Sequence, residues 1–306
     1  MQPTLPPLSD VDLRQLRIFR TVVESRGFTQ AQGELGISRS TISAQMAALE
    51  TRLGLTLCRR GRSGFALTEH GQKIYTETIK FFAAMDNFRT EVGAMRGSLV
   101  GELRIGIVDA VVENPNCAFD RAIAVFNERV PNVHLTLTVI SPNQIESELL
   151  SRQMEIAIVP NQPMNGAVQL QQLFHEEQNL FCGVRHPLFG TDTARLSLEL
   201  IAEQAYARRG YAVATAYNTL FKHAPSATAY NMEGQAHLVL SGRFVSFLPR
   251  HYAQRYVERG EMRALRPDLL SFKIPLCVAH LPQSVLSRVA RAFRECLLEV
   301  HARKPQ

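Results

Sequence analysis

A short stretch of the sequence, from residue 38 to residue 45, carries hydrogen-bonding and cationic side chains but no acidic one. An Arg guanidinium can donate two hydrogen bonds to a guanine edge in the major groove of DNA, and a Gln amide can pair similarly with adenine. Ser and Thr hydroxyls can contact a base or a phosphate. The stretch therefore predicts contact with duplex DNA through Ser38, Arg39, Ser40, Thr41, Ser43 and Gln45.

Three short helices would position this stretch. Apolar residues recur with helical spacing over 10–27, a second helix fits 29–35, and the third runs from a cap at Ser38 to a stop at Gly54. A tight turn at Gly36 would join the second helix to the third, which makes the three a helix-turn-helix. The buried side of the third helix would consist of Ile42, Met46, Leu49 and Leu53.

Two further arginines occupy a glycine-containing turn after the third helix. Extended pieces flank the segment 60–64, whose glycines suit a hairpin, or wing. Arg60 and Arg62 at its tip would face phosphate or a narrow minor groove. Residues 1–65 contain nine Arg against five Asp and Glu, a formal charge of +4. A solvated surface helix could explain the polar stretch alone, but the turn, the hairpin and the charge together favour DNA.

A long helix is predicted from residue 69 to residue 95. Its apolar residues alternate steps of four and three, and this 3.5-residue period is typical of a coiled-coil seam. The seam consists of Ile74, Thr78, Phe81, Met85, Phe88, Val92 and Met95. This seam could pack against a second copy of the same helix, or alternatively against the helix's own domain. Because one period persists over the whole length, the pattern favours pairing with the same helix of a second copy.

After a hinge at 93–98, predicted strands alternate with predicted helices, which indicates α/β layers in two lobes with a largely parallel sheet. Strands are expected at 103–108, 133–140, 156–159, 179–184, 244–248 and 274–280, and helices at 118–129, 144–152, 214–223, 234–240 and 285–300. Ligands of such folds bind beyond the carboxyl ends of the strands, in a cleft. The predicted contacts to a small-molecule effector are Asp109, Ala110, Ser141, Asn143, Pro160, Tyr206, Arg208 and Ser246.

The charges in this set leave the chemistry of the effector open. Arg208 or its neighbour Arg209 could bind the carboxylate of an organic acid. Asp109 would instead favour a cationic or hydroxylated ligand. A solvated arginine pair and a helix-capping Asp109 are the structural alternatives.

Other function classes have little support in the sequence. It contains no GxxxxGKS or GxxxxGKT, no HExxH and no GxSxG motif, so an enzyme is not expected. The five cysteines are scattered without CxxC spacing, and we expect free thiols, no metal site and no cofactor. No apolar run could span a bilayer and the N-terminus does not read as a signal peptide, so we expect a cytoplasmic protein without a membrane partner. A solute-binding protein of the periplasmic type is the alternative for the two-lobed part.

The first 65 residues resemble the winged helix-turn-helix of LysR-type transcriptional regulators. Matching positions include Phe28-Thr29-Gln30-Ala31, Leu35, Ser38, Ser43, Gln45, Leu49-Glu50, Leu53-Gly54, Leu57, Arg60, Leu67-Thr68 and Gly71. The segment from Gly101 to Gly106 resembles the first strand of the family's effector domain. The sequence departs from the family pattern at Gln32, Arg39, Ala44 and Cys58.

This resemblance implies a multidomain α and α/β protein. A winged helix-turn-helix DNA-binding domain is expected over 1–67, a linker and dimerisation helix with its hinge over 68–97, and a two-lobed effector-binding domain of the type 2 periplasmic-binding-protein kind over 98–306. Lobe I would comprise 98–162 and 268–306, and lobe II 163–267. The resemblance also implies a homodimer or homotetramer joined by the linker helix, double-stranded DNA and an organic-acid effector as ligands, and RNA polymerase as a further partner.

Overall fold

The computed structural model describes residues 7–61, 64–95, 99–164, 166–192, 195–211 and 219–302. The chain divides into two compact units, Met1–Asp86 and Asn87–Gln306, and each is described here by itself. The division falls inside the long helix α4 (Glu69–Met95). The hinge that the sequence places at 93–98 includes residues 96–98, which lie outside the described residues.

The first unit begins with three helices, α1 (Asp10–Glu24), α2 (Ala31–Leu35) and α3 (Arg39–Leu53). Gly36 and Gly54 end α2 and α3 with left-handed φ angles of 63° and 65°, a conformation that glycine adopts at little cost. The three helices confirm the predicted helix-turn-helix. The first two are shorter than their patterns suggested, since α1 ends at Glu24 and α2 begins only at Ala31.

Apolar packing and one ion pair hold α1 against α3. Ile42, Met46 and Leu49 are buried, as predicted, in a core that also contains Phe19. The Arg52 guanidinium on α3 lies 2.8 Å from the Asp12 carboxylate on α1, and this hydrogen bond lowers the pKa of Asp12 to about 2. The orientation of α3 is therefore fixed by its inner side, which leaves its outer side available for a ligand.

A two-stranded hairpin, β1 (Cys58–Gly61) and β2 (Gly64–Leu67), follows α3. The Glu50 carboxylate of α3 accepts the backbone N–H groups of Leu57 and Cys58 at 2.7 and 3.2 Å. This contact ties the base of the hairpin to α3.

Helix α4 presents two apolar faces. One face, with Tyr75, Ile79 and Phe82, is buried in the core of the first unit. The first half of the predicted seam also packs against its own unit, since Ile74, Phe81 and Met85 contact this core and Thr78 is buried, as the alternative reading expects. The second half extends beyond the core, where Phe88 is 70% exposed and Val92 is 37% exposed. The described part of the chain therefore does not cover the end of the seam.

The second unit is built on a seven-stranded sheet. Its order is β10 (Met262–Ala264), β6 (Gln169–Gly183), β11 (Ser271–His280), β5 (Ile156–Pro160), β3 (Gly101–Ile107) and β4 (Val133–Val139), with β9 (Ser246–Pro249) also paired to β6. Strands β3, β4 and β5 are parallel, whereas β6 and β11 are antiparallel to each other. The predicted largely parallel sheet is wrong in this respect. The two long strands β6 and β11 run in opposite directions through both lobes, so every pairing they make within this sheet is antiparallel.

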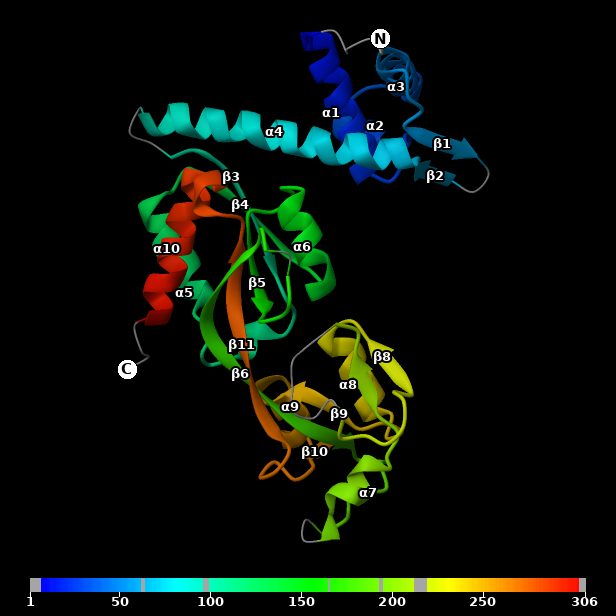
Figure 1. Ribbon diagram of the computed structural model, residues 1–306, viewed down its shortest axis with the longest axis vertical. Helices are drawn as coiled ribbons and strands as arrows, with labels where there is room; N and C mark the ends of the chain where they lie inside the picture. The colour runs from blue at the N-terminus through cyan, green and yellow to red at the C-terminus, as the bar shows by residue number, and fades with distance from the viewer. Residues whose placement is uncertain are drawn as a thin grey trace. The chain divides into compact units, whose positions relative to one another are not determined.

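Lobe I surrounds β3, β4 and β5. Helices α5 (Phe119–Arg129) and α10 (Arg288–Ala302) cover one face of the strands and α6 (Pro142–Leu150) covers the other (Figure 1). Because α10 belongs to the end of the chain, lobe I is assembled from two separate stretches of sequence. The Phe293 ring of α10 packs edge-on against Phe126 of α5, with centroids 5.2 Å apart.

Lobe II lies between these two stretches in the sequence. Its core forms two clusters that meet at the end of β6, one with Leu180 and Cys182 and the other with Phe181. Its elements are α7 (Leu198–Ala202), β7 (Ala207–Arg209), β8 (Ala227–Ala229), α8 (Met232–Leu240), β9 (Ser246–Pro249), α9 (Arg250–Glu258) and β10 (Met262–Ala264).

Some predicted elements differ from the structure. Of the helix expected at 214–223, residues 214–218 lie outside the described residues and 219–223 are not helical. The last helix begins at Arg288 rather than at residue 285, after the short 3-10 turn η3 (Gln283–Val285). None of the helices in the described ranges is both long and apolar enough to cross a bilayer.

Candidate functional site

The first turn of α3 is an exposed polar surface. Ser38 is the predicted N-cap, which the structure confirms: its hydroxyl accepts the backbone N–H of Thr41 at 3.1 Å. The Ser38 hydroxyl also lies 2.8 Å from the hydroxyls of Ser40 and Thr41. Arg39 is exposed, and the first turn contains no acidic residue. The helix dipole and the unpaired N–H groups of such a turn attract anions, so this surface is suited to phosphate and base edges.

The two later members of the predicted set are less available. Ser43 and Gln45 are half-buried, and the Gln45 side-chain oxygen accepts a hydrogen bond from Gln15 of α1 at 3.3 Å. To read adenine, Gln45 would have to exchange that contact. The structure therefore gathers the exposed predicted residues in one turn, from Ser38 to Thr41.

The predicted wing arginines, Arg60 and Arg62, follow α3 in the sequence. The backbone of Arg60 pairs with Phe65, and Arg62 lies outside the described residues. The neighbouring Arg59 is exposed on β1 and was not among the predicted contacts. Its position in the RRGR run of the sequence was the signal that pointed to it.

In the second unit, two hydrogen bonds join lobe I to lobe II. Asp109, which follows β3 in lobe I, accepts the backbone N–H of Met232 at the start of α8 in lobe II. Asn143, at the start of α6 in lobe I, donates to the carbonyl oxygen of Gly210 in lobe II at 2.8 Å. Burial raises the pKa of Asp109, which the Met232 amide partly offsets. Both predicted residues thus lie at the junction of the lobes.

Three other predicted residues are wholly or partly buried in the second unit. Ser141 caps α6 by position, but its hydroxyl is buried and has no hydrogen-bond partner among the described residues. Pro160 is buried in β5, opposite Leu276. Ser246 is almost fully buried, and its hydroxyl donates to the carbonyl oxygen of Ala207 at 2.8 Å. Of the two serines, Ser246 is therefore engaged with the backbone, whereas the Ser141 hydroxyl has no partner among the described residues.

Of the two neighbouring arginines, Arg209 faces the interior. Arg208 is exposed, because successive residues of a strand point to opposite sides. Arg209 donates to the Gln178 side chain and to the carbonyl oxygen of Phe247, and its guanidinium lies 5.9 Å from the Tyr211 ring. Tyr206 is stacked on Phe221 at 4.0 Å, in the lobe II core. Of this pair, Arg209 is therefore the arginine that side chains of the second unit hold in place.

A buried polar chain behind Arg209 was not predicted. The Gln178 amide donates to Glu176 at 2.6 Å, and Glu176 also contacts the His251 ring nitrogen at 3.0 Å. Glu176 and Gln178 belong to the polar run His175–Asn179 of β6, and such a run in the sequence gives no sign that these two side chains are buried. These hydrogen bonds hold Arg209 in place, because Gln178, Glu176 and His251 are all buried or nearly buried.

Models of two protein families match this sequence, one near its N-terminus and one over the rest. Residues 13–72 match the profile of the bacterial regulatory helix-turn-helix protein, lysR family, and residues 96–302 match that of the LysR substrate binding domain. The chain is 37% identical over 296 residues to the HTH-type transcriptional activator BauR of Pseudomonas aeruginosa, covering 95% of this chain and 97% of that protein. It is 25% identical over 300 residues to the RuBisCO operon transcriptional regulator of Allochromatium vinosum, covering 96% and 97%.

Solved structures show the same fold. Full-length CbnR in complex with its target DNA gives a TM-score of 0.63 at 18% identity, covering 94% of this chain and 99% of that one. Full-length OxyR from Pseudomonas aeruginosa gives 0.62 at 19% identity, covering 95% and 94%. With its helix-turn-helix DNA-binding unit and its two-lobed effector-binding domain, the chain belongs to the LysR family of bacterial transcriptional regulators.

Proposed function

We propose that the first turn of α3 reads the base edges of an operator, with Arg39 as the main base contact and Ser40 and Thr41 on phosphate or base. The observation that carries this proposal is that the turn is exposed, cationic and without acid, and stands on a helix fixed from behind by a buried core. The wing arginines Arg60 and Arg62 add contacts to the DNA backbone. Ser43 and Gln45 lie one turn further along and read the neighbouring bases.

Replacing the two kinds of arginine is expected to give two different results. Arg39→Ala should weaken binding to the operator roughly 10- to 100-fold and leave binding to random duplex less affected, because a base contact discriminates by about 1–3 kcal/mol. Arg62→Ala should weaken both duplexes similarly and reduce the salt dependence. Fluorescence anisotropy measures the affinity of each variant for random duplex and for an operator that is found by genome-wide mapping. The exposed Arg259→Ala in lobe II is the control, and equal losses from Arg39→Ala on both duplexes would contradict a base-reading role.

The DNA-binding units act in pairs. One unit offers few contacts, whereas two recognition helices on one dimer reach two half-sites of an operator. The uncovered end of the α4 seam, at Phe88 and Val92, supports a homodimer joined by this helix, from which a homotetramer can be assembled. At a promoter the complex then meets RNA polymerase as a further partner. The site of action is the cytoplasm, where a bacterial chromosome lies.

The effector occupies the cleft between the lobes. Arg209 is suited to the carboxylate of a small organic acid, and Asp109 to a hydroxyl or amino group of the same molecule. The unpartnered Ser141 hydroxyl supplies a further hydrogen bond. A ligand that replaces the Asp109–Met232 and Asn143–Gly210 contacts binds one arrangement of the lobes better than another, and only such a difference in affinity can shift their populations.

The chain contains a matched pair of variants for this cleft. Arg209→Gln is expected to weaken an organic-acid effector, found by thermal-shift screening, by at least about 10-fold, since it removes a charge-assisted hydrogen bond. Arg208→Gln removes the same charge from the exposed neighbour and should leave the affinity unchanged. Isothermal titration calorimetry of both variants measures the effector affinity and shows whether only Arg209 binds the carboxylate. A loss of similar size in the two would place the carboxylate elsewhere.

A further inference from the structure

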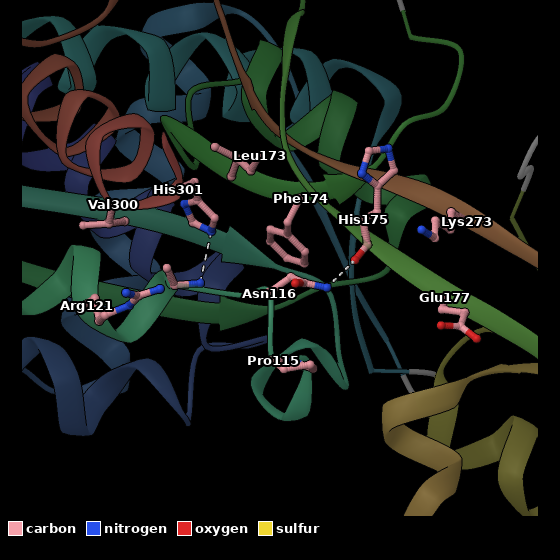
Figure 2. Close-up of a pocket in the computed structure, with 11 residues that line it drawn as sticks. Pro115, Asn116, Arg121, Leu173, Phe174, His175, Glu177, Lys273, Val300 and His301 are labelled. Carbon is pink, nitrogen blue, oxygen red and sulfur yellow. Dashed lines mark hydrogen bonds between the residues drawn. The ribbon is translucent and has the colours of Figure 1, made fainter. Parts of the chain in front are cut away.

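A second pocket lies on lobe I, apart from the cleft. Its volume is about 530 Å³, within the range of small-molecule sites. It is lined by the N-terminal end of α5, the first half of β6, Lys273 of β11 and the C-terminal end of α10 (Figure 2). None of the cleft residues described above lines it. We propose that this pocket is a second ligand site, which binds a small organic carboxylate with an apolar body.

The floor of the pocket is apolar and its shape follows from an irregularity in β6. The pairing of β6 with β11 shifts between Leu276, opposite Phe174, and Cys277, opposite Gln172, so Leu173 is an extra residue in the strand. Such a bulge bends a strand and changes the direction of its side chains. Phe174 is buried here with its ring stacked on His301 at 5.4 Å. Together with Val300, these residues can hold a hydrocarbon or aromatic body.

His301 contributes a ring face rather than a charge. One of its nitrogens, Nδ1, lies 2.7 Å from the Leu297 carbonyl oxygen, to which it donates. The other, Nε2, accepts the backbone N–H of Ala118 at 3.1 Å, and the dashed line in Figure 2 marks this bond. Because one nitrogen donates and the other accepts, the ring is neutral, and burial lowers its pKa. The charge of the pocket must come from other residues.

Two cations supply that charge. Arg121 of α5 and Lys273 of β11 lie on either side of Phe174 in Figure 2. Within the described residues neither has a carboxylate within 4.0 Å. The acid in the lining, Glu177, lies opposite Lys273 in the strand pairing but forms its ion pair with Arg250 at 3.3 Å. An apolar floor between two cations without partners fits an amphipathic anion. Arg121 can form the fork-shaped pair that a carboxylate prefers, so we assign the carboxylate to Arg121 and a supporting role to Lys273.

The test uses the full-length protein and a panel of straight-chain and phenyl-substituted carboxylates of four to ten carbons, each with its uncharged amide. Isothermal titration should show that at least one carboxylate binds and that its amide does not. Arg121→Gln should weaken that binding at least about 10-fold and Lys273→Gln about threefold, while Arg209→Gln and the exposed control Arg259→Gln leave it unchanged. Arg121 is exposed, so an unchanged melting temperature is expected and excludes a folding defect.

Two results would contradict the proposal of a ligand site in this pocket. One is that no carboxylate of the panel binds at millimolar concentration. The other is that binding depends on Arg209 and not on Arg121, which would place the ligand in the cleft. Neither result bears on DNA binding by α3. The first leaves the proposed cleft effector untouched and the second would support it, so failure of this site is distinguishable from failure of the cleft proposal, which Arg209→Gln and Arg208→Gln test with the cleft effector.

Discussion

Gly71→Ala is expected to destabilise the DNA-binding unit severely. Gly71 lies in the first turn of α4, and a Cβ atom there would stand 1.9 Å from the carbonyl oxygen of Leu57, a backbone atom at the base of the wing. Because no side chain can move aside, the helix and hairpin must separate. Overpacking of this kind costs typically 1–3 kcal/mol, and the short distance places this site at the upper end, about 3 kcal/mol. The melting temperature of the unit should fall by roughly 15 °C.

Gly33→Ala is the matched control. Gly33 lies in α2 of the same unit, and an added Cβ would meet no atom within 4 Å. Because alanine favours a helix over glycine, this variant should be neutral or stabilised by up to about 1 kcal/mol. Circular dichroism and operator binding over a temperature series compare the two. If Gly71→Ala melts with the wild type, the close packing of α4 on the wing is not as described.

The double variant Phe88→Glu with Val92→Glu is expected to separate the protein into monomers. These two residues form the uncovered end of the α4 seam, and in a symmetric pair four carboxylates would be brought together on an apolar interface. Loss of the second recognition helix removes the gain from simultaneous binding, so operator affinity should fall at least about 100-fold. Sedimentation should give the 34.3 kDa mass of one chain, and anisotropy measures the affinity.

Val112→Glu is the control for this experiment, since Val112 is 87% exposed and lies outside α4. It adds a carboxylate at a comparable apolar surface position and should change neither mass nor affinity. A double variant that keeps the mass of a dimer would exclude the α4 seam as the joining surface.

The DNA-binding unit was the most predictable part of the molecule, because its signals are local. The cap at Ser38, the turns at Gly36 and Gly54 and the buried side of α3 each depend on residues within a few positions of one another, and the structure confirms them. The crossing strands were less predictable. β6 carries the charged residues Glu176 and Glu177 in its middle, so its pattern suggested only the short strand at 179–184.

The ligand sites depend on side-chain direction and on distant segments, which no local pattern contains. The sequence pointed to both Arg208 and Arg209, but only the strand's orientation places Arg209 inside. Ser246 was expected in the cleft and is instead engaged with the Ala207 backbone. The second pocket joins residues near 120, 174, 273 and 301, which meet only because the chain returns to lobe I after completing lobe II.

This return of the chain has a consequence for synthesis on the ribosome. Lobe II is one continuous segment and can fold as soon as it emerges. Lobe I cannot, because Phe293 of α10 fills the space against Phe119 and Phe126, and α10 is made last. The apolar sides of α5 and of strands β3, β4 and β5 therefore remain exposed to solvent while lobe II is translated. A nascent chain in that interval presents the kind of surface that holdase chaperones bind, and the emergence of α10 covers it.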